Sequence, residues 1–293
     1  MALKLACIPA YNEEKTISEI VKKCLNYVDK VLVCDDGSTD NTAKLAKENG
    51  AQVISHKKNQ GYGAAIASLF ESAQNQNADI MVTIDGDGQH DPDQIPVLMD
   101  ILTQHNVDVV IGSRFLDNQT STPRYRKHGI KIITSAANYG TNLPVSDAQS
   151  GFRAYSKNAI MSIHPTEQGM AVSTEILLKI SNKGLSLAEV PITVSYEGNT
   201  SKQHPVPHGI AVLVNTLKYI SVKHPILFYG FPGIALVIIG SILGYQFLDA
   251  YLNRDLVLLG SLMASIVLFL AGTILCMTSV ILFTMATLIR ERY

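Results

Sequence analysis

Four aspartates lie in the stretch VTIDGDGQHDPD, residues 82–93: Asp85, Asp87, Asp91 and Asp93. Carboxylates this close together repel one another unless a cation lies among them. Apolar β-forming residues precede the first aspartate, so the cluster is expected at the end of a strand. Clustered carboxylate oxygens are typical ligands of hard divalent cations. The chemistry that this stretch could support is therefore the binding of a divalent cation.

The acidic stretch allows three interpretations. An EF-hand loop needs glycine at its sixth position and glutamate at its twelfth, and counting from Asp85 these positions hold His90 and Pro96. A solvent-exposed acidic turn without function is the second interpretation. The third is a Mg²⁺ or Mn²⁺ site shared with a phosphate ligand, because Mg²⁺ takes one or two carboxylates together with substrate phosphates and water. We favour the third, since Gly86 and Gly88 let the backbone approach a ligand closely.

The elements that must position this stretch follow from the alternation of short apolar runs with helix-length segments. Strands are expected at residues 3–8, 31–34, 52–54, 80–84 and 107–111, and helices at 13–25, 42–48 and 64–73. Further along, strands are expected around SGFRAYS and AEVPITV, with a helix at 174–183 between them. Alternation of this kind predicts an α/β fold with a mostly parallel sheet.

Polar clusters follow three of the expected strands. PAYNEE follows the first strand, DDGSTD the second and DGDGQHD the fourth. In parallel sheets, ligands bind at the edge where the carboxyl ends of the strands meet. We therefore expect the three clusters to form one site.

The segment NQGYGAAI, residues 59–66, contains G-x-G but lacks the last glycine of a dinucleotide-binding fingerprint. It does not predict a dinucleotide site. A helix N-terminus that meets phosphate groups remains open as an interpretation.

The last part of the chain is almost free of charge. Residues 226–248 form a run of 23 residues, about 35 Å as a helix, and a bilayer core is about 30 Å thick. A second apolar run spans residues 256–289. Two transmembrane helices are the favoured interpretation, and two buried core helices are the alternative.

A short segment connects the soluble part to the first apolar run. Its apolar residues recur at helical spacing: Ile210, Leu213, Val214, Leu217 and Ile220. The pattern predicts an amphipathic helix at the membrane surface or, equally, a helix packed on the soluble core. We expect a catalytic domain at 1–205, an amphipathic helix at 206–224 and a transmembrane hairpin at 225–293.

Charges around the hairpin predict its orientation. Lys218 and Lys223 precede the first span, and Arg290 and Arg292 follow the second. Basic flanks face the cytoplasm, so a multi-pass membrane protein with two spans and a cytoplasmic soluble domain is expected. The four cysteines show no C-x-x-C spacing, which fits a reducing compartment. A net charge of −1 favours no nucleic-acid partner, and the sequence predicts no oligomeric state.

Five segments occur in a fixed order in the first 160 residues: IPAYNEE, DDGSTDNT, IDGDGQHDP, VIGSRF and SGFRAYSK. With these motifs the chain resembles family 2 glycosyltransferases of the GT-A type. Within that family it is most similar to dolichyl- and polyprenyl-phosphate sugar synthases, some of which carry short C-terminal transmembrane tails. The resemblance implies a GT-A fold, a UDP- or GDP-sugar donor and a polyprenyl- or dolichyl-phosphate acceptor in the bilayer.

The resemblance also implies roles for individual residues. Positions that match nucleotide-sugar-binding residues are Pro9, Tyr11, Glu13, Asp36, Asp85, Gly86 and Asp87. Asp87 and Gln89 match ligands of Mg²⁺ or Mn²⁺. Arg114 and Arg126 resemble arginines that meet phosphate oxygens, and Lys202 is expected to act in the same way.

The chemistry expected of such a site is one displacement at the anomeric carbon, which inverts its configuration. Charge builds up on the departing diphosphate, and a divalent ion and arginines such as Arg114 stabilise it. A lipid phosphate is already ionised near neutral pH, so a strong general base is unnecessary. Asp147 matches the position where enzymes with hydroxyl acceptors need a base. Here it is expected to act as that base or to orient sugar or acceptor.

Three alternatives stay open at this point. One is transfer to the hydroxyl of a lipid-linked or soluble sugar, with Asp147 as base. A processive polysaccharide synthase is disfavoured, because such enzymes carry a Q-x-x-R-W motif and this chain contains no tryptophan. A non-catalytic membrane anchor that senses nucleotide sugars is the third.

Overall fold

The computed structural model describes residues 2–117, 130–131, 133–135, 137–138, 141, 143–195, 221, 225–254 and 258–291. The chain divides into two compact units, Met1–Thr216 and Leu217–Tyr293. Each unit is described by itself. The domain boundaries expected at residues 205 and 224 fall outside the described residues and stay predictions.

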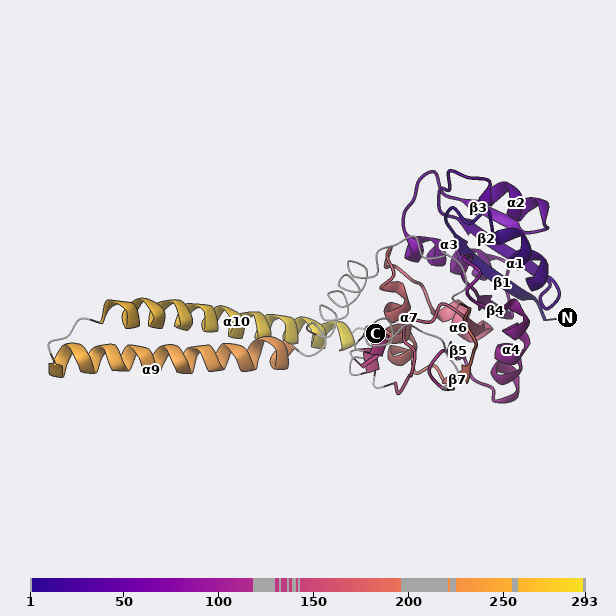
Figure 1. The fold of residues 1–293 in the computed structure, drawn as a ribbon. Coiled ribbons are helices and arrows are strands. Elements are labelled where there is room, and N and C mark those ends of the chain that lie inside the picture. Colours follow the sequence, from indigo (N-terminus) through magenta and orange to yellow (C-terminus); the bar gives the residue numbers. More distant parts are fainter. Residues whose placement is uncertain are drawn as a thin grey trace. The chain divides into compact units, whose positions relative to one another are not determined.

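A single sheet forms the centre of the first unit (Figure 1). Among the described residues its strands are β1 (Lys4–Ala10), β2 (Lys30–Asp35), β3 (Gln52–Ser55), β4 (Ile80–Thr83), β5 (Val109–Ser113), β6 (Arg153–Ser156) and β7 (Leu187–Pro191). Their order across the sheet is β3-β2-β1-β4-β6-β5-β7. Only β6 runs against its neighbours β4 and β5, and the other neighbouring pairs are parallel.

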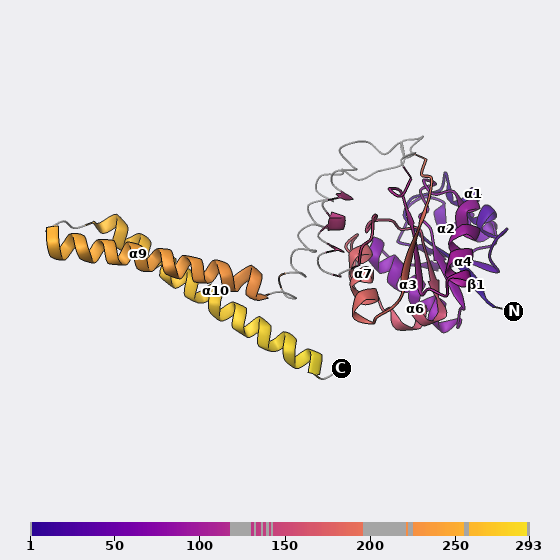
Figure 2. The same cartoon turned by 90° about the horizontal axis from the view of Figure 1, so that it is seen from below.

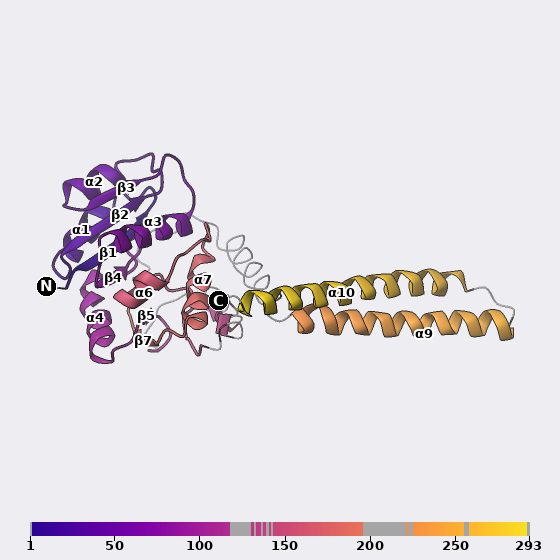
Figure 3. The same ribbon diagram turned by 180° about the vertical axis from the view of Figure 1, so that it is seen from behind.

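Two helical layers cover the sheet, as Figure 2 shows. The helices described in this unit are α1 (Ile17–Cys24), α2 (Thr42–Glu48), α3 (Tyr62–Asn75), α4 (Ile95–Gln104), α6 (Lys157–Ser162) and α7 (Val172–Asn182). Buried residues of α3, α6 and α7 share one apolar cluster, whose face of the sheet is seen in Figure 3. Those of α1, α2 and α4 share the other cluster. Alternate residues of each strand enter opposite clusters, as the pleat requires.

The predicted α/β architecture of the GT-A type, with a mostly parallel sheet, is confirmed. The sequence patterns missed α4 and α6. They placed the start of the first helix four residues early, because Glu13 to Thr16 form turns that lead into α1. Gly50 has a φ of 96° just after α2, in the left-handed region that favours glycine at a helix end.

The register of the sheet brings the expected clusters to one edge. Ala10 pairs with Asp35 at the ends of β1 and β2, and Cys7 pairs with Thr83 at the end of β4. These three parallel strands therefore deliver PAYNEE, DDGSTD and DGDGQHD to the same edge. Gly37 and Gly88 have φ angles of 73° and 76°, which lets the chain turn sharply there.

The second unit is a helical hairpin. A π-helical turn (Ile226–Gly230) leads into α9 (Phe231–Arg254), and α10 (Leu259–Glu291) returns beside it in all three views. Small residues let the two backbones approach: a Cβ on Gly240 would lie 2.9 Å from the nitrogen of Phe269. The Ser265 hydroxyl also donates to the Gly240 carbonyl over 2.7 Å.

Both hairpin helices are long and apolar enough to cross a membrane, at Ile226–Asn253 and Leu259–Met285. Only 17% and 11% of their most apolar windows are buried, which fits lipid-facing helices and not buried core helices. The prediction of two C-terminal apolar helices is confirmed. Of the expected amphipathic helix, the structure describes only Ser221, so that expectation stays a prediction.

Candidate active site

Hydrogen bonds from two other elements hold the acidic loop after β4. The Tyr62 hydroxyl donates to Asp85 Oδ1 over 2.9 Å, and His90 Nδ1 lies 3.5 Å from Asp85 Oδ2. The Thr16 hydroxyl donates to the Gly86 carbonyl over 2.6 Å. Asp87 Oδ1 accepts the backbone N–H of Gln89 over 3.0 Å. The loop is therefore pinned to α3 and to the start of α1.

Electrostatics single out Asp87 within this loop. Burial, together with the neighbouring charges of Asp85 and Glu13, raises the pKa of Asp87 to about 7. A carboxylate in such surroundings is stabilised when a cation comes close.

A divalent cation fits the donors at this loop. In the described residues, no three or more His, Cys, Asp or Glu side chains group in a way that could hold a metal by themselves. Mg²⁺ does not need such a cage, because substrate phosphates and water complete its six oxygen ligands. The carboxylate of Asp87, close to that of Asp85 and followed by the amide of Gln89, provides the incomplete set that this arrangement requires.

The end of β1 and the segment that follows it lie against this loop. Gly86 packs so closely on β1 that a Cβ there would lie 3.1 Å from the Pro9 carbonyl oxygen. The effect of Glu13 on Asp87 places these two side chains near one another. Tyr11, 41% exposed, follows the same strand. The structure thus brings Pro9 and Glu13 to the acidic loop.

Asp36 is buried and turned toward the segment between β3 and α3. One oxygen accepts His56 Nδ1 over 2.7 Å and the N–H of Gln60 over 2.9 Å, and the other accepts the N–H of Gly61 over 2.8 Å. The second ring nitrogen of His56 lies 2.9 Å from the Ser68 hydroxyl. Asp36 therefore fixes the entry to α3. Sequence patterns gave no reason to single out His56, because its partners lie on other elements.

The N-terminus of α3 meets a carbonyl group. The N–H groups of Gly63 and Ala64 donate to the Gln168 carbonyl over 2.7 and 3.3 Å. A Cβ at Gly63 would lie 2.0 Å from the Glu167 carbonyl oxygen, so only glycine fits there. These two amides are committed within the protein, which argues against the interpretation that they bind phosphate.

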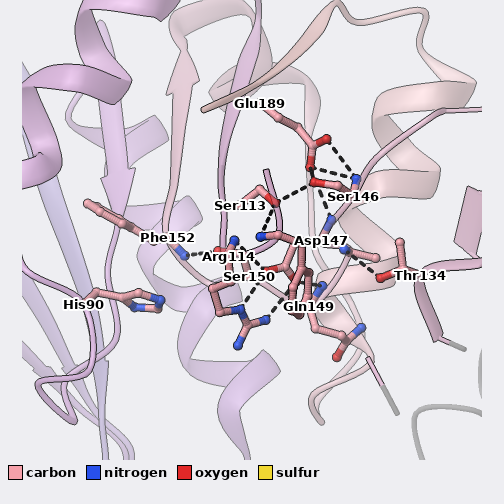
Figure 4. A network of polar contacts seen from close by, with 12 residues as sticks. His90, Ser113, Arg114, Thr134, Ser146, Asp147, Gln149, Ser150, Phe152 and Glu189 are labelled. Atoms are coloured by element: carbon pink, nitrogen blue, oxygen red, sulfur yellow. Dashed lines mark hydrogen bonds and ion pairs between the residues drawn. The ribbon is translucent and has the colours of Figure 1, made fainter. Parts of the chain in front are cut away.

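Arg114 forms an ion pair with the buried Asp147, shown in Figure 4. Arg114 Nε donates to Asp147 Oδ2 over 2.6 Å, and Nη2 donates to Oδ1 over 2.8 Å. The backbone N–H of Arg114 also reaches Oδ2, and that of Gln149 reaches Oδ1, each over 3.3 Å. A carboxylate offers about four acceptor positions. All four of Asp147 are therefore in use.

Glu189 holds the turn that carries Asp147. Its carboxylate accepts the N–H of Ser146 over 2.8 Å, the hydroxyl of Ser146 over 3.0 Å and the N–H of Asp147 over 3.3 Å. Burial raises the pKa of Glu189, and the charge of Asp147 adds to this, although the hydrogen bonds from Ser146 oppose it. Sequence reasoning missed Glu189, which lies 42 residues beyond Asp147 in the chain.

His90, near the end of the acidic loop, lies close to Asp85 and within electrostatic reach of the Arg114–Asp147 pair. Its ring, 5% exposed, lies 5.3 Å from the ring of Phe152. Burial and the positive charge of Arg114 lower the pKa of His90 and outweigh the opposing charges of Asp85 and Asp147, so the ring is neutral near pH 7. Within the described part of the chain, its Nδ1 is the buried side-chain nitrogen or oxygen atom without a hydrogen bond.

A buried arginine supports the same turn from below. Arg153, 2% exposed, donates to the carbonyls of Ala148, Ser150 and Ser173 over 2.9, 2.8 and 3.2 Å. Next to it, a Cβ on Gly151 would lie 2.7 Å from both oxygens of Asp85. The turn that begins at Asp147 thus packs directly on the acidic loop.

The structure therefore gathers Pro9, Glu13, Asp85, Gly86, Asp87, Gln89, Arg114 and Asp147 at one edge of the sheet, with Asp36 beside the entry to α3. Arg126 and Lys202 lie outside the described residues, so their roles stay predictions.

Comparisons with known proteins show the family of this chain. Residues 6–163 match the model of glycosyl transferase family 2. The chain is 33% identical over 214 residues to the UDP-N-acetylglucosamine–dolichyl-phosphate N-acetylglucosaminyltransferase of Methanococcus voltae, covering 64% of this chain and 84% of that protein. It is 29% identical over 202 residues to the polyprenol monophosphomannose synthase of Mycolicibacterium smegmatis, covering 64% and 76%.

Among solved structures, the glucosyl-3-phosphoglycerate synthase of Mycobacterium tuberculosis in complex with UDP superposes with a TM-score of 0.61 and 24% identity, covering 75% of this chain and 80% of that one. This likeness concerns the fold. The family match covers more than half of the chain and includes the acidic loop, Arg114 and Asp147. The chain belongs to glycosyl transferase family 2.

Proposed function

We propose that this glycosyltransferase moves a hexose from a UDP- or GDP-sugar to polyprenyl or dolichyl phosphate, with inversion at the anomeric carbon. Relatives named for transfer to dolichyl phosphate and for polyprenol monophosphomannose synthesis support the acceptor class. The two apolar C-terminal helices support a reaction at a membrane.

The observation that carries the proposal is that hydrogen bonds occupy all four acceptor positions of the Asp147 carboxylate. A hydroxyl acceptor must lose its proton to a base that presents an open acceptor position. Asp147 holds the position where such a base is expected, but its oxygens already accept four hydrogen bonds, two of them from the Arg114 side chain. A phosphate acceptor is largely ionised at neutral pH and needs no such base. The geometry therefore favours a phosphate over a hydroxyl.

On the donor side, we propose that Asp87 and Gln89 hold Mg²⁺ or Mn²⁺ against the diphosphate. The ion would offset the negative charge that develops on the leaving group. A neighbour in fold was crystallised with Mg²⁺ and UDP, and with Mn²⁺ and UDP-glucose, which supports either metal. Asp85 and Gly86 would line the diphosphate.

The nucleoside would lie along the segment after β1. We propose that Pro9, Tyr11 and Glu13 line the base and ribose, and that Asp36 contacts the base or shapes its pocket through Gly61. Arg114, with Arg126 and Lys202, would bind the acceptor phosphate. The basic residues flanking the spans support a cytoplasmic catalytic domain at 1–205, followed by an amphipathic helix at 206–224 and a hairpin at 225–293.

The test uses membranes that contain the full-length protein, a panel of UDP- and GDP-sugars, and Mg²⁺ or Mn²⁺. Two matched acceptors are compared, a polyprenyl phosphate and the polyprenol of the same length. We expect mass spectrometry to find a polyprenyl-phosphate sugar with the first acceptor and no glycoside with the second. Transfer to the alcohol, or to a sugar hydroxyl only, would show instead that Asp147 acts as a base.

A further inference from the structure

Glu189 reaches from an outer strand of the sheet to the turn that carries Asp147. It lies on β7, opposite Ile111 of the parallel strand β5. Strand β5 ends at Ser113, and Arg114 follows directly. The Ser146 hydroxyl, which donates to Glu189, also lies 2.5 Å from the Ser113 hydroxyl. One carboxylate therefore connects β7, the end of β5 and the Asp147 turn, as Figure 4 shows.

The contacts of Glu189 require a carboxylate. Both of its oxygens accept the N–H of Ser146, over 3.0 and 2.8 Å, and one also accepts the N–H of Asp147. Two successive backbone N–H groups that converge in this way form a small anion site. A glutamine of the same shape would turn an NH₂ group toward one of these donors. The exchange would therefore disturb the turn without opening a cavity.

Through these contacts, Glu189 influences the orientation of Arg114 indirectly. Glu189 fixes the backbone of Ser146 and Asp147, and the Asp147 carboxylate fixes the guanidinium through Nε and Nη2. A guanidinium is a rigid planar fork, so fixing one edge sets the direction of the opposite edge. A second anion that binds Arg114 would therefore meet a guanidinium whose direction these contacts set.

We propose that Glu189 is a positioning residue that, through the Ser146–Asp147 turn, orients Arg114 to bind the acceptor phosphate. This inference rests on the proposed function, because it takes a lipid phosphate as the acceptor. Glu189 does not touch the substrate. Its effect should therefore appear where the lipid phosphate binds, while the nucleotide site stays intact.

The chain offers a matched control in Glu175 on α7. Its carboxylate accepts the N–H of Thr166 on both oxygens, over 3.0 Å each, the Thr166 hydroxyl over 2.6 Å and the N–H of Glu167 over 2.9 Å. It also pairs with Lys179 over 2.8 Å. Glu175→Gln thus loses at least as many hydrogen bonds as Glu189→Gln, but Glu175 makes none of the contacts that hold Arg114.

The experiment compares parent, Glu189→Gln and Glu175→Gln as full-length proteins in detergent. The KM of a polyprenyl phosphate, kcat, the Kd of UDP or GDP and the melting temperature are measured for each. We expect Glu189→Gln to raise the acceptor KM about tenfold, as the loss of a hydrogen bond to a charged group would, and to leave the nucleotide Kd within about twofold of the parent. Glu175→Gln should lower the melting temperature similarly without changing the acceptor KM.

A milder variant keeps the inference testable if Glu189→Gln does not fold. Ser146→Ala removes only the contacts of the hydroxyl with Glu189 and Ser113 and should raise the acceptor KM about threefold, in the same direction. The positioning role is wrong if Glu189→Gln matches Glu175→Gln, or if its loss appears in nucleotide affinity instead. If the parent makes no polyprenyl-phosphate sugar with any donor, the proposed function fails, and the role of Glu189 toward a lipid phosphate fails with it.

Discussion

At the scale of single residues, Asp87 is the carboxyl group of the site whose charged form its surroundings disfavour most. Burial raises its pKa to about 7, together with the neighbouring charges of Asp85 and Glu13. Near neutral pH, roughly half of the protein without metal therefore holds a proton on this carboxyl group. A metal ion must displace that proton before Asp87 can serve as a ligand, so proton and metal compete for one site.

This competition predicts how metal affinity depends on pH. As pH falls below about 7, the apparent affinity for Mn²⁺ should drop, approaching about tenfold per pH unit, and above about pH 8 it should be constant. Mn²⁺ binding to the full-length protein with UDP or GDP, followed by electron paramagnetic resonance, measures this. Asp87→Asn should bind weakly and lose the steep dependence. A parent affinity that does not change between pH 6 and 8 would contradict the assignment of Asp87 as a ligand.

Residues of this kind differ in how far the sequence reveals them. Asp85, Asp87 and Gln89 are close in the chain and follow a recognisable strand, so their pattern predicts a site. His56, Tyr62 and Glu189 act through partners on other elements, such as the pair of Glu189 and Ser146, separated by 43 residues. No periodicity encodes such a pair. The sequence does not reveal that the Asp147 carboxylate is fully hydrogen-bonded, because its partner Arg114 lies 33 residues before it.

At the scale of elements, Asp108, which lies just before β5, connects β5 to the segments next to β6 and β7. Its carboxylate accepts the side-chain amide of Asn158 over 2.8 Å and the N–H and hydroxyl of Ser186 over 2.9 Å each. Burial alone would raise the pKa of Asp108, but the hydrogen bonds from Asn158 and Ser186 outweigh it and hold the pKa below its usual value. Asp108 thus stabilises the junction of β5, β6 and β7 only when it is ionised.

The sign of this shift predicts a pH-dependent loss of stability. A lowered pKa in the folded protein gives stability that is present above the unfolded pKa and is lost as pH falls through the folded pKa. Asp108→Asn should therefore cost about 1 kcal/mol at neutral pH, a fall of a few degrees in melting temperature. The difference from the parent should shrink below about pH 4. Thermal unfolding of the full-length protein at several pH values measures this.

Asp100 supplies the control, since it is exposed on α4. Asp100→Asn should melt with the parent at every pH. If the melting temperature of Asp108→Asn stayed as far below that of the parent at acidic pH as at neutral pH, the charge of Asp108 would not be the cause of the lost stability.

The missed helix α4 shows where the elements could have been predicted better. Its residues Ile95, Leu98, Met99 and Leu102 are buried at helical spacing, and that spacing is visible in the sequence. Pro92 and Pro96, near its start, weaken a helix prediction there. By contrast, α6 has only six residues and follows β6 directly. Its place depends on packing against the sheet, which no local pattern specifies.

At the scale of the whole molecule, the chain combines a unit with its own core and a hairpin without one. The sheet unit buries apolar residues on both faces of its sheet. The hairpin helices remain mostly exposed. A unit with a complete core is expected to fold by itself, whereas exposed apolar helices of this length need a bilayer. The hairpin would therefore serve to keep the catalytic unit at the membrane.

A truncated chain that ends at Thr216 tests whether the hairpin serves only to keep the catalytic unit at the membrane. We expect it to bind UDP or GDP as tightly as the parent, because the described donor-side residues belong to the first unit. With a short, water-soluble prenyl phosphate it should keep its rate within a few-fold. With a long polyprenyl phosphate in vesicles, its reaction rate should fall about a hundredfold. Tethering the enzyme and the acceptor to one membrane surface raises their effective concentration by that order, and the truncated protein lacks this tether. The parent in the same vesicles is the reference, and an equal loss with both acceptors would mean that the hairpin contributes to the active site itself.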